Sequence, residues 1–368
     1  MSATVRPHRP SAPVPVPGAA PRLAERLIGW QRQHGRHALP WQGSDPYRVW
    51  LSEVMLQQTQ VSTVRDYFER FTARFPDIVT LAAAPLDDVL AAWSGLGYYS
   101  RARNLHRCAQ VLVAEHGGRF PSRAAELVQL PGIGRSTAAA IAVFCFGERA
   151  AILDGNVKRV LTRVLGNAND LSVAAHERAL WLQAEALLPE HDIARYTQGL
   201  MDLGATLCTP RKPACLLCPW QATCVARAEG RPEHYPVKTR KLKRGQRAHA
   251  LLWLVRRGPA ADHVWLVQRP ATGVWAGLWS LPEFESVDAL RAAAVDWPGQ
   301  GEALTTLAHA LTHFDWAMTP WRLVLPAALS AARRARLEAA LPEGRWFSLD
   351  AALKLGLPAP VRKLLQPR

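Results

Sequence analysis

The chain has 368 residues, 49% of them hydrophobic, which is enough to form the cores of two domains of ordinary size. The formal net charge of +15 is concentrated in residues 1–247, with 32 basic and 20 acidic side chains against 13 and 10 in residues 248–368. No run approaches the roughly 18 apolar residues of a membrane span, so we expect no membrane association. A basic surface favours a polyanion such as nucleic acid as the partner, although charge also serves solubility.

The N-terminal part of the chain divides into a tail and a helical region. The first twenty residues carry five prolines and lack the apolar segment of a signal peptide, so we expect residues 1–21 to be disordered and the protein to be cytoplasmic. Beyond them, Val64, Tyr67, Phe68 and Phe71 follow the spacing of an amphipathic helix. Similar patterns predict helices over residues 86–93, 102–113, 157–165 and 176–188.

The composition changes after residue 230. Residues 231–247 are mostly polar and basic, which is typical of a linker. Three short β-branched or aromatic runs then predict strands at residues 250–255, 264–268 and 321–325. Eight of the fourteen tryptophans also fall in this last third. A small α+β domain over residues 248–368 fits this pattern.

Four cysteines close together near the middle of the chain are the strongest single signal. Cys208, Cys215, Cys218 and Cys224 form the pattern C-x6-C-x2-C-x5-C. Four thiolates at such spacing can hold zinc or an iron–sulfur cluster, and the spacing alone leaves both open. Disulfides are the alternative, and a reducing cytoplasm disfavours them.

A glycine-rich turn joins two predicted helices, residues 123–129 and 135–146. The sequence Leu-Pro-Gly-Ile-Gly at residues 130–134 places Gly132 and Gly134 in this turn. Two glycines permit a tight turn with outward N–H groups, and the helix N-terminus that follows adds more, so the turn is able to bind a phosphate. An ordinary helix connection would have the same spacing.

Several motifs together resemble those of a known family. LPGIGRSTA at residues 130–138, LDGNVKRVL at 153–161 and the cysteine array resemble the endonuclease III superfamily of helix–hairpin–helix DNA glycosylases. SEVMLQQTQV at 52–61 and GLGYYSRARNLH at 95–106 narrow the resemblance to the A/G-specific adenine DNA glycosylases, the MutY family, from about residue 22 to the end. The resemblance implies removal of adenine opposite 8-oxoguanine or guanine in double-stranded DNA.

The same resemblance implies a multi-domain fold. An all-α catalytic domain over residues 22–230 would contain the helix–hairpin–helix at about 123–146 and a loop at 208–224 in which the four cysteines hold a 4Fe–4S cluster. The C-terminal domain would be a Nudix-like lesion-recognition domain, with Gly-Leu-Trp at residues 277–279 as part of its signature. The acidic cluster of a Nudix box is missing, so we expect no nucleotide hydrolysis there.

Two carboxylates match the catalytic residues of the family. Asp154 corresponds to the carboxylate that stabilises the oxocarbenium-like sugar, and Asn156 to a residue that positions it. Glu53 corresponds to the general acid that protonates adenine N7, a role that needs burial to keep the carboxyl protonated near neutral pH. Without the surrounding motifs, a turn residue or helix cap would be the favoured role for Asp154 and a solvated side chain the favoured role for Glu53.

Ser136 stands where bifunctional relatives carry the lysine whose amine attacks the sugar. Without that amine no Schiff base forms at this position, so we expect base removal without efficient strand cleavage. Lys158 lies nearby in sequence and is a candidate for weak product trapping or, more simply, for a phosphate contact.

The remaining family positions concern recognition of the lesion. Residues that would enter the duplex or contact the damaged base are Gln58, Thr59, Leu96 and Tyr98. Thr312 and His313 stand in a Leu-Thr-His sequence where the family commonly has Phe-Ser-His, so the polar groups remain and Leu311 replaces an aromatic ring. Core packing and a polar strand face are the structural alternatives for these residues.

Two other functions compete with this reading. An endonuclease III-like glycosylase and lyase would act on oxidised pyrimidines, and a non-catalytic cluster-bearing DNA-binding protein would need neither Glu53 nor Asp154. We expect a monomer, associated with the nucleoid in a bacterial cell. The preference for 8-oxoguanine over guanine, a redox role of the cluster and a covalent intermediate at Asp154 are not encoded in any recognisable motif.

Overall fold

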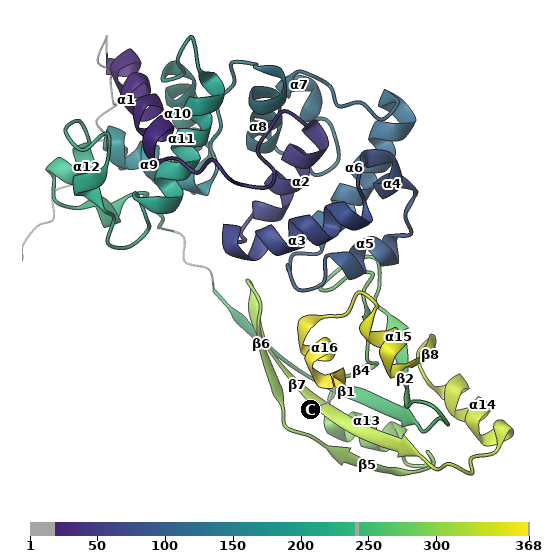
Figure 1. The fold of residues 1–368 in the computed structure, drawn as a ribbon. Helices are drawn as coiled ribbons and strands as arrows, with labels where there is room; N and C mark the ends of the chain where they lie inside the picture. The colour runs from purple at the N-terminus through teal and green to yellow at the C-terminus, as the bar shows by residue number, and fades with distance from the viewer. Residues whose placement is uncertain (1–18, 240–242, 367–368) are drawn as a thin grey trace, which may run out of the picture. The chain divides into compact units, whose positions relative to one another are not determined.

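The computed structural model describes residues 19–239 and 243–366, which fold into two compact units (Figure 1). The first comprises the described residues within 1–68 and 108–241, and the second those within 69–107 and 242–368. Two helices, α3 (Val61–Arg74) and α6 (Ser100–His116), each contribute residues to both units. The second unit is therefore built from two separate stretches of the sequence.

The first unit is helical in its described part, as predicted. Its helices and 3-10 turns are α1 (Ala19–His34), α2 (Pro46–Leu56), α7 (Ala124–Leu127), α8 (Arg135–Phe146), α9 (Gly155–Leu165), α10 (Ala174–Ala186), α11 (Ile193–Thr206), η1 (Cys215–Leu217), α12 (Val225–Ala228) and η2 (Pro232–His234). One core joins α1, α9, α10 and α11, and Leu27, Leu161 and Leu203 are fully buried in it. Figure 1 shows these four helices gathered together.

Helix α9 is short and strongly amphipathic, and both of its ends are specified by sequence. Asp154 caps the N-terminus, and Gly166 ends the helix in the left-handed conformation, with φ 65°. Its packing against α11 is close, because a Cβ added to Gly204 would lie 2.7 Å from the Cβ of Asn156. Only glycine permits this approach of the two helices.

The second unit contains a mixed sheet and several short helices. The helices are α4 (Ile78–Ala83), α5 (Leu86–Ala92), α13 (Val287–Ala293), α14 (Ala331–Ala340), α15 (Leu349–Leu353) and α16 (Ala359–Leu365). The strands are β1 (Gly245–Arg256), β2 (His263–Gln268), β3 (Trp279–Ser280), β4 (Glu283–Phe284), β5 (Gln300–Ala303), β6 (Leu307–Ala310), β7 (Phe314–Leu325) and β8 (Gly344–Ser348). Their order is β3-β2-β1-β7-β5, with β4 on β1, β6 on β7 and β8 on β2.

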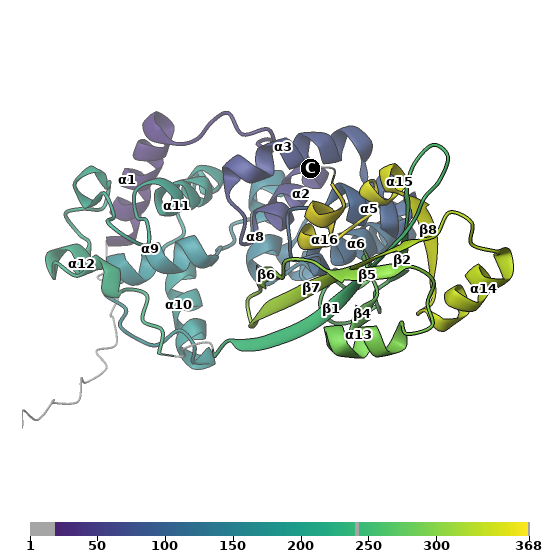
Figure 2. The ribbon, with the colours of Figure 1, turned by 90° about the horizontal axis from the view of Figure 1, so that it is seen from below.

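The sheet is covered by helices on both faces (Figure 2). Long strands β1 and β7 pair in parallel, from Gly245 opposite Phe314 to Arg256 opposite Leu325. Alternate side chains enter different cores, so that Leu251 packs with α15 and α16 whereas Leu252 packs with α13 and α14. This alternation is why short β-branched and aromatic runs identified the strands.

Residues 69–107 are bound into the second unit by specific contacts. Arg103 Nη1 donates to the carbonyl oxygen of Ala276 at 2.7 Å, and Trp279 Nε1 donates to Asp87 Oδ2 at 3.1 Å. The side chain of Leu90 lies so close to Gly356 that an added Cβ there would be 3.0 Å from Leu90 Cβ. The segment is therefore part of the core that supports the sheet.

The structure confirms the predicted fold class and revises several boundaries. Helix α1 begins at Ala19, inside the predicted tail, whose residues 1–18 lie outside the described part of the chain. Strand β1 begins at Gly245, inside the predicted linker, because it extends to pair with β7. Helix α2 ends at Leu56, and Gln58, two residues later, has a left-handed φ of 59°. None of the helices in the described ranges is long and apolar enough to cross a membrane.

Candidate active site and cluster loop

Asp154 occupies the N-cap of α9, so the capping role is real. Its Oδ1 accepts a hydrogen bond from the backbone N–H of Val157 at 2.8 Å. Burial raises the pKa of this carboxyl, while the Val157 hydrogen bond and the positive charge of Arg159 act in the opposite direction. The cap holds the carboxylate in one orientation, which is what electrostatic stabilisation of a nearby cation requires.

Ser136 and Asn156 each form a hydrogen bond with a residue close to Asp154 in the sequence. The Ser136 hydroxyl oxygen accepts the backbone N–H of Leu153 at 3.1 Å, which fixes α8 to the residue before Asp154. Asn156 Oδ1 accepts a hydrogen bond from Arg159 Nη2 at 2.8 Å. Ser136 therefore holds the residue before Asp154, whereas the hydrogen bond of Asn156 lies within α9.

Glu53 lies on α2 in the same unit and is half-buried. Burial, and to a smaller extent the negative charge of Asp154, raise the pKa of its carboxyl from 4.5 to about 8. A carboxyl with such a pKa is mostly protonated at neutral pH and available as a general acid. The carboxyl groups of Glu53 and Asp154 are therefore close enough for the charge of one to affect the protonation of the other.

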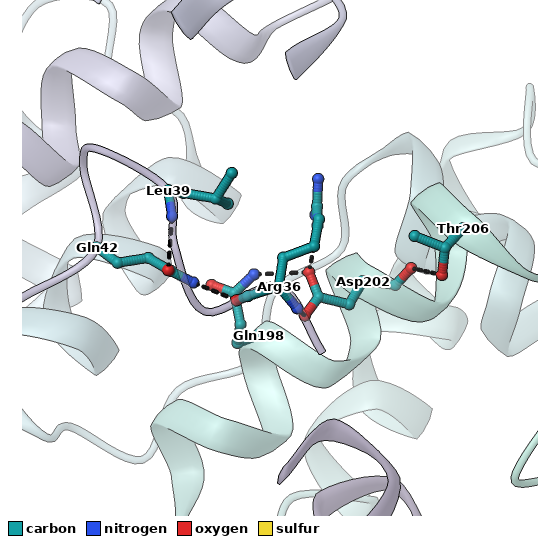
Figure 3. Close-up of polar contacts among 6 residues, drawn as sticks. All are labelled: Arg36, Leu39, Gln42, Gln198, Asp202 and Thr206. Atoms are coloured by element: carbon teal, nitrogen blue, oxygen red, sulfur yellow. Dashed lines mark hydrogen bonds and ion pairs between the residues drawn. The ribbon is translucent and has the colours of Figure 1, made fainter. Parts of the chain in front are cut away.

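The side chain of Glu53 lines a pocket, here named the Glu53 pocket, that also contains three polar side chains the sequence motifs did not identify. Its wall includes Arg36, Gln42, Ser52, Glu53, Leu56, Gln198 and Met201. Figure 3 shows the polar network at one side of the pocket, centred on the carboxylate of Asp202. Asp202 Oδ1 accepts from Arg36 Nε at 2.7 Å and from Gln198 Nε2 at 2.8 Å.

Gln42, which had no predicted role, ties together the loop before α2. Its Oε1 accepts the backbone N–H of Leu39 at 3.0 Å, and its Nε2 donates to the carbonyl of Arg36 at 2.6 Å. Asp202 is 1% exposed and also accepts the backbone N–H of Arg36 at 3.0 Å. The i, i+4 spacing of Gln198 and Asp202 was the available sequence signal, and it became informative only once α11 faced this loop.

The glycine turn has the geometry expected of a phosphate-binding hairpin. Gly132 has a left-handed φ of 76°, and Gly134 is the N-cap of α8 without any side-chain capping bond. Both glycines are exposed, and no described atom lies within 4 Å of a Cβ built on Gly134. The N-terminal N–H groups of α8 are therefore accessible to an anion.

Lys158 is committed to an ion pair on the same side of the domain. Its Nζ lies 2.6 Å from Glu177 Oε1. This carboxylate competes with any phosphate or sugar carbon for the ammonium group. Lys158, on α9, is therefore paired with Glu177, on α10.

Gln58 and Thr59 lie at the end of α2, in the first unit. Gln58 is exposed and holds a left-handed backbone conformation, which is uncommon for a residue other than glycine. Thr59 follows it, and its hydroxyl donates to the carbonyl of Gln57 at 3.4 Å. The turn projects the Gln58 side chain into solvent.

A second cavity, here named the Tyr98 cavity, lies entirely in the second unit and brings together residues far apart in sequence. Tyr98 and Thr312 face each other, with their hydroxyl oxygens 3.3 Å apart. Tyr98 is 45% exposed, and both Thr312 and His313 are exposed. Leu96, Tyr98, Trp275, His309, Thr312 and His313 all line the cavity.

Leu96 differs from the other residues of this group because it is only 6% exposed. Its insertion into a duplex would require movement of its own segment. An aromatic residue without a predicted role forms another wall: Trp275 stacks on Trp316, with ring centroids 4.8 Å apart. Trp275 has a left-handed φ of 57°, which no local sequence pattern announces for a bulky residue.

The four predicted metal ligands lie in one loop next to α9. Cys208, Cys215, Cys218 and Cys224 all line one small pocket with Arg163 and Leu203, and all six cysteines of the chain are free. Burial, together with the charges of the other three thiols, raises the pKa of Cys218 to about 12. Four mutually repelling sulfurs in a partly buried pocket require a cation to exist together as thiolates.

A single zinc ion and a 4Fe–4S cluster place different requirements on four cysteine thiols. Within residues 19–239 and 243–366, no three His, Cys, Asp or Glu side chains gather closely enough to hold one metal ion. A single zinc would require every sulfur at about 2.3 Å from one point. In a 4Fe–4S cluster each cysteine binds a different iron, so the sulfurs stand farther apart.

Comparisons with known proteins give the same picture from the whole chain. The HhH-GPD superfamily base excision DNA repair model matches residues 51–185, and the NUDIX domain model matches residues 252–367. The adenine DNA glycosylase of Buchnera aphidicola subsp. Acyrthosiphon pisum (strain APS) is 34% identical over 352 residues, covering 94% of this chain and 97% of that protein. The human adenine DNA glycosylase is 36% identical over 307 residues, covering 70% of this chain and 56% of that protein.

A solved structure resembles the helical part. The structure of a thermostable thymine-DNA glycosylase superposes with a TM-score of 0.51 and 28% sequence identity, covering 56% of this chain and 95% of that chain. The near-complete coverage of the bacterial relative and the two matching domain models identify the family of the chain. It belongs to the adenine DNA glycosylase family and is a base-excision repair DNA glycosylase.

Proposed function

We propose that this enzyme removes adenine mispaired with 8-oxoguanine or guanine in double-stranded DNA, by hydrolysis and without strand cleavage. The observation that carries the proposal is the Glu53 carboxyl, whose pKa burial raises to about 8, in a pocket of the unit that also holds Asp154. A base expelled as an anion is a poor leaving group. A protonated carboxyl beside an oriented carboxylate suits this chemistry.

In the proposed reaction Glu53 donates its proton to N7 of the flipped adenine. The bond between C1′ and N9 then breaks, its electron pair goes to the base, and positive charge develops on the sugar. The Asp154 carboxylate, fixed by the Val157 N–H at 2.8 Å, stabilises that charge. Water adds to C1′, and its proton returns to Glu53. The polar groups of Arg36 and Gln198 in the Glu53 pocket are placed to bind the edge of the base.

The absence of lyase chemistry follows from two positions. Ser136 has no amine, and its hydroxyl is engaged with the N–H of Leu153 at 3.1 Å. The nearby Lys158 is engaged with Glu177 at 2.6 Å. Neither residue supports the Schiff base of an endonuclease III-like lyase.

Recognition of the base opposite adenine is assigned to the Tyr98 cavity. Tyr98, Thr312 and His313 supply exposed hydrogen-bonding groups there, with the hydroxyls of Tyr98 and Thr312 3.3 Å apart. Gln58 and Thr59 would enter the duplex, and the N–H groups at Gly132 and Gly134 would bind phosphate. We propose that Cys208, Cys215, Cys218 and Cys224 hold a 4Fe–4S cluster, which orders this loop when bound.

The test uses duplexes with a labelled adenine opposite 8-oxoguanine, guanine or thymine, scored before and after hot alkali. We expect strand breaks only after alkali and only opposite the two purines. Breaks without alkali would revive the lyase. Excision that survives a Glu53→Gln, Asp154→Asn double substitution would remove the proposed mechanism, whereas binding without excision by the wild-type protein would indicate a non-catalytic DNA-binding protein.

A further inference from the structure

Arg163, on α9, is a buried cation whose hydrogen bonds go to neutral groups. The residue is 2% exposed. Its guanidinium donates to the carbonyl oxygens of Thr209 at 2.7 Å, Pro210 at 3.1 Å and Tyr235 at 3.3 Å. Within the described residues it forms no ion pair with a carboxylate. Its remaining partner is a sulfur, since Nη1 lies 3.3 Å from Sγ of Cys208.

A second arginine makes this charge harder to explain by the protein alone. Arg159, one turn earlier on α9, donates through Nε to the carbonyl of Cys208 at 2.7 Å. Two guanidinium groups on one side of α9 therefore both donate to Cys208, Arg159 to its carbonyl oxygen and Arg163 to its sulfur. Burying an uncompensated charge costs several kcal/mol, and carbonyl dipoles offset only part of that cost. A counter-charge is needed on the side of Cys208.

The cysteine array supplies that counter-charge only in its ligating form. Four thiolates outweigh the positive charge of a 4Fe–4S core, so the cluster together with its ligands is anionic. We propose that Arg163 is a positioning residue of the cluster: its charge balances the cluster, and its N–H···S bond to Cys208 raises the reduction potential. This inference rests on the cluster proposed above.

The physical reason is the charge that reduction adds. An electron placed on the cluster increases negative charge on the iron and on the ligand sulfurs. A nearby cation and a hydrogen bond to a ligand sulfur both stabilise this reduced form, and they belong to the few means by which a protein tunes such potentials. The carbonyl bonds to Thr209, Pro210 and Tyr235 keep the guanidinium fixed against the sulfur.

The experiment compares the wild-type protein with Arg163→Met and Arg163→Lys. Arg211→Met is the matched control, because Arg211 is an exposed arginine of the same loop. Iron and sulfide content and visible absorption are measured first, and the reduction potential is then measured by voltammetry. We expect Arg163→Met to raise the oxidised-to-reduced ratio at a fixed potential about tenfold, which is about 59 mV for one electron. Arg163→Lys keeps the positive charge but loses the geometry of the N–H···S bond, so we expect the oxidised-to-reduced ratio to rise about threefold. The control variant Arg211→Met should leave the ratio unchanged.

The outcomes separate this inference from the proposed cofactor. A wild-type protein without iron and sulfide would remove the cofactor itself. If the cluster is present and the wild-type protein and Arg163→Met have the same reduction potential, Arg163 only binds carbonyl groups, and the inference is overturned. If Arg163→Met does not fold, the test uses Arg163→Lys instead. A reduction potential of Arg163→Lys equal to that of the wild type would refute the role of the N–H···S bond.

Discussion

The Glu53 pocket and the Tyr98 cavity both present polar groups, but those of the first adjoin a buried carboxylate, Asp202, whereas Tyr98, Thr312 and His313 of the second are exposed. Asp202 in the first network is 1% exposed, whereas Tyr98 is 45% exposed. Burial shifts proton affinity, as the pKa of about 8 for Glu53 shows, and it makes each interaction strong. Exposed groups keep ordinary properties and are free to meet a large partner. The first arrangement suits chemistry on one base, and the second suits discrimination along a duplex.

If this contrast is right, the largest effect follows from Glu53→Gln. We expect excision of adenine opposite 8-oxoguanine to fall about 10²- to 10⁴-fold, because the amide cannot donate the proton. Single-turnover rates measure this directly. Glu25→Gln, on an exposed residue of α1, is the control and should match the wild type.

The same substitution has an opposite effect on stability. The folded pKa of Glu53, about 8, lies above 4.5, so the native state binds the proton more tightly and wild-type stability falls as pH rises from about 4.5 to 8. The glutamine side chain has no proton to lose, so Glu53→Gln does not lose stability as the pH rises. The free energy of unfolding of the variant should therefore exceed that of the wild type by at most about 5 kcal/mol at pH 8. Below pH 4.5 the two free energies should be equal. Denaturant titrations at pH 4.5 and 8 measure this difference in unfolding free energy between variant and wild type. An equal difference at both pH values would contradict the raised pKa of Glu53.

Asp154→Asn keeps the shape of the cap and removes its charge. We expect excision to fall on the order of 10³-fold, since a preorganised charge that stabilises the transition state is lost. Affinity for a duplex with a non-cleavable adenine analogue should change little. A parallel loss of affinity would mean that the substitution disturbs α9 rather than the chemistry.

Effects in the Tyr98 cavity should be smaller and confined to discrimination. Thr312→Ala removes one hydroxyl that faces Tyr98 at 3.3 Å. We expect the ratio of rates opposite 8-oxoguanine and guanine to fall roughly three- to tenfold, the value of one hydrogen bond. Thr312→Ser should restore the ratio, and a uniform loss opposite both purines would contradict a discriminating role.

The smallest effect is expected from Leu311→Phe, which restores the aromatic residue common in the family. An added ring at the edge of this cavity should increase the preference for 8-oxoguanine about threefold. The comparison of rates opposite 8-oxoguanine and guanine measures it. An unchanged ratio would show that Leu311 already supplies the contact that matters.

The fold class was predictable from the sequence because its signals are local, whereas the roles of Glu53 and Asp154 came from the resemblance to a family and stay predictions. Asp154 follows the hairpin and begins an amphipathic helix, and the four cysteines lie within one short segment. Arg36 and Asp202 escaped prediction because 166 residues separate them, and only the packed helices bring them together. The left-handed backbone of Gln58 and Trp275 also had no signal, since residues of these types rarely adopt it.

The discontinuous second unit has a consequence for engineering. Leu90, Asp87 and Arg103 come from the helical half of the sequence yet pack with Gly356, Trp279 and Ala276. A chimaera that exchanges only the residues after the linker would break these contacts and leave apolar surface on both partners. A graft that also carries residues 69–107 would transfer a complete core, because the second unit of this enzyme is encoded as two separate pieces of sequence.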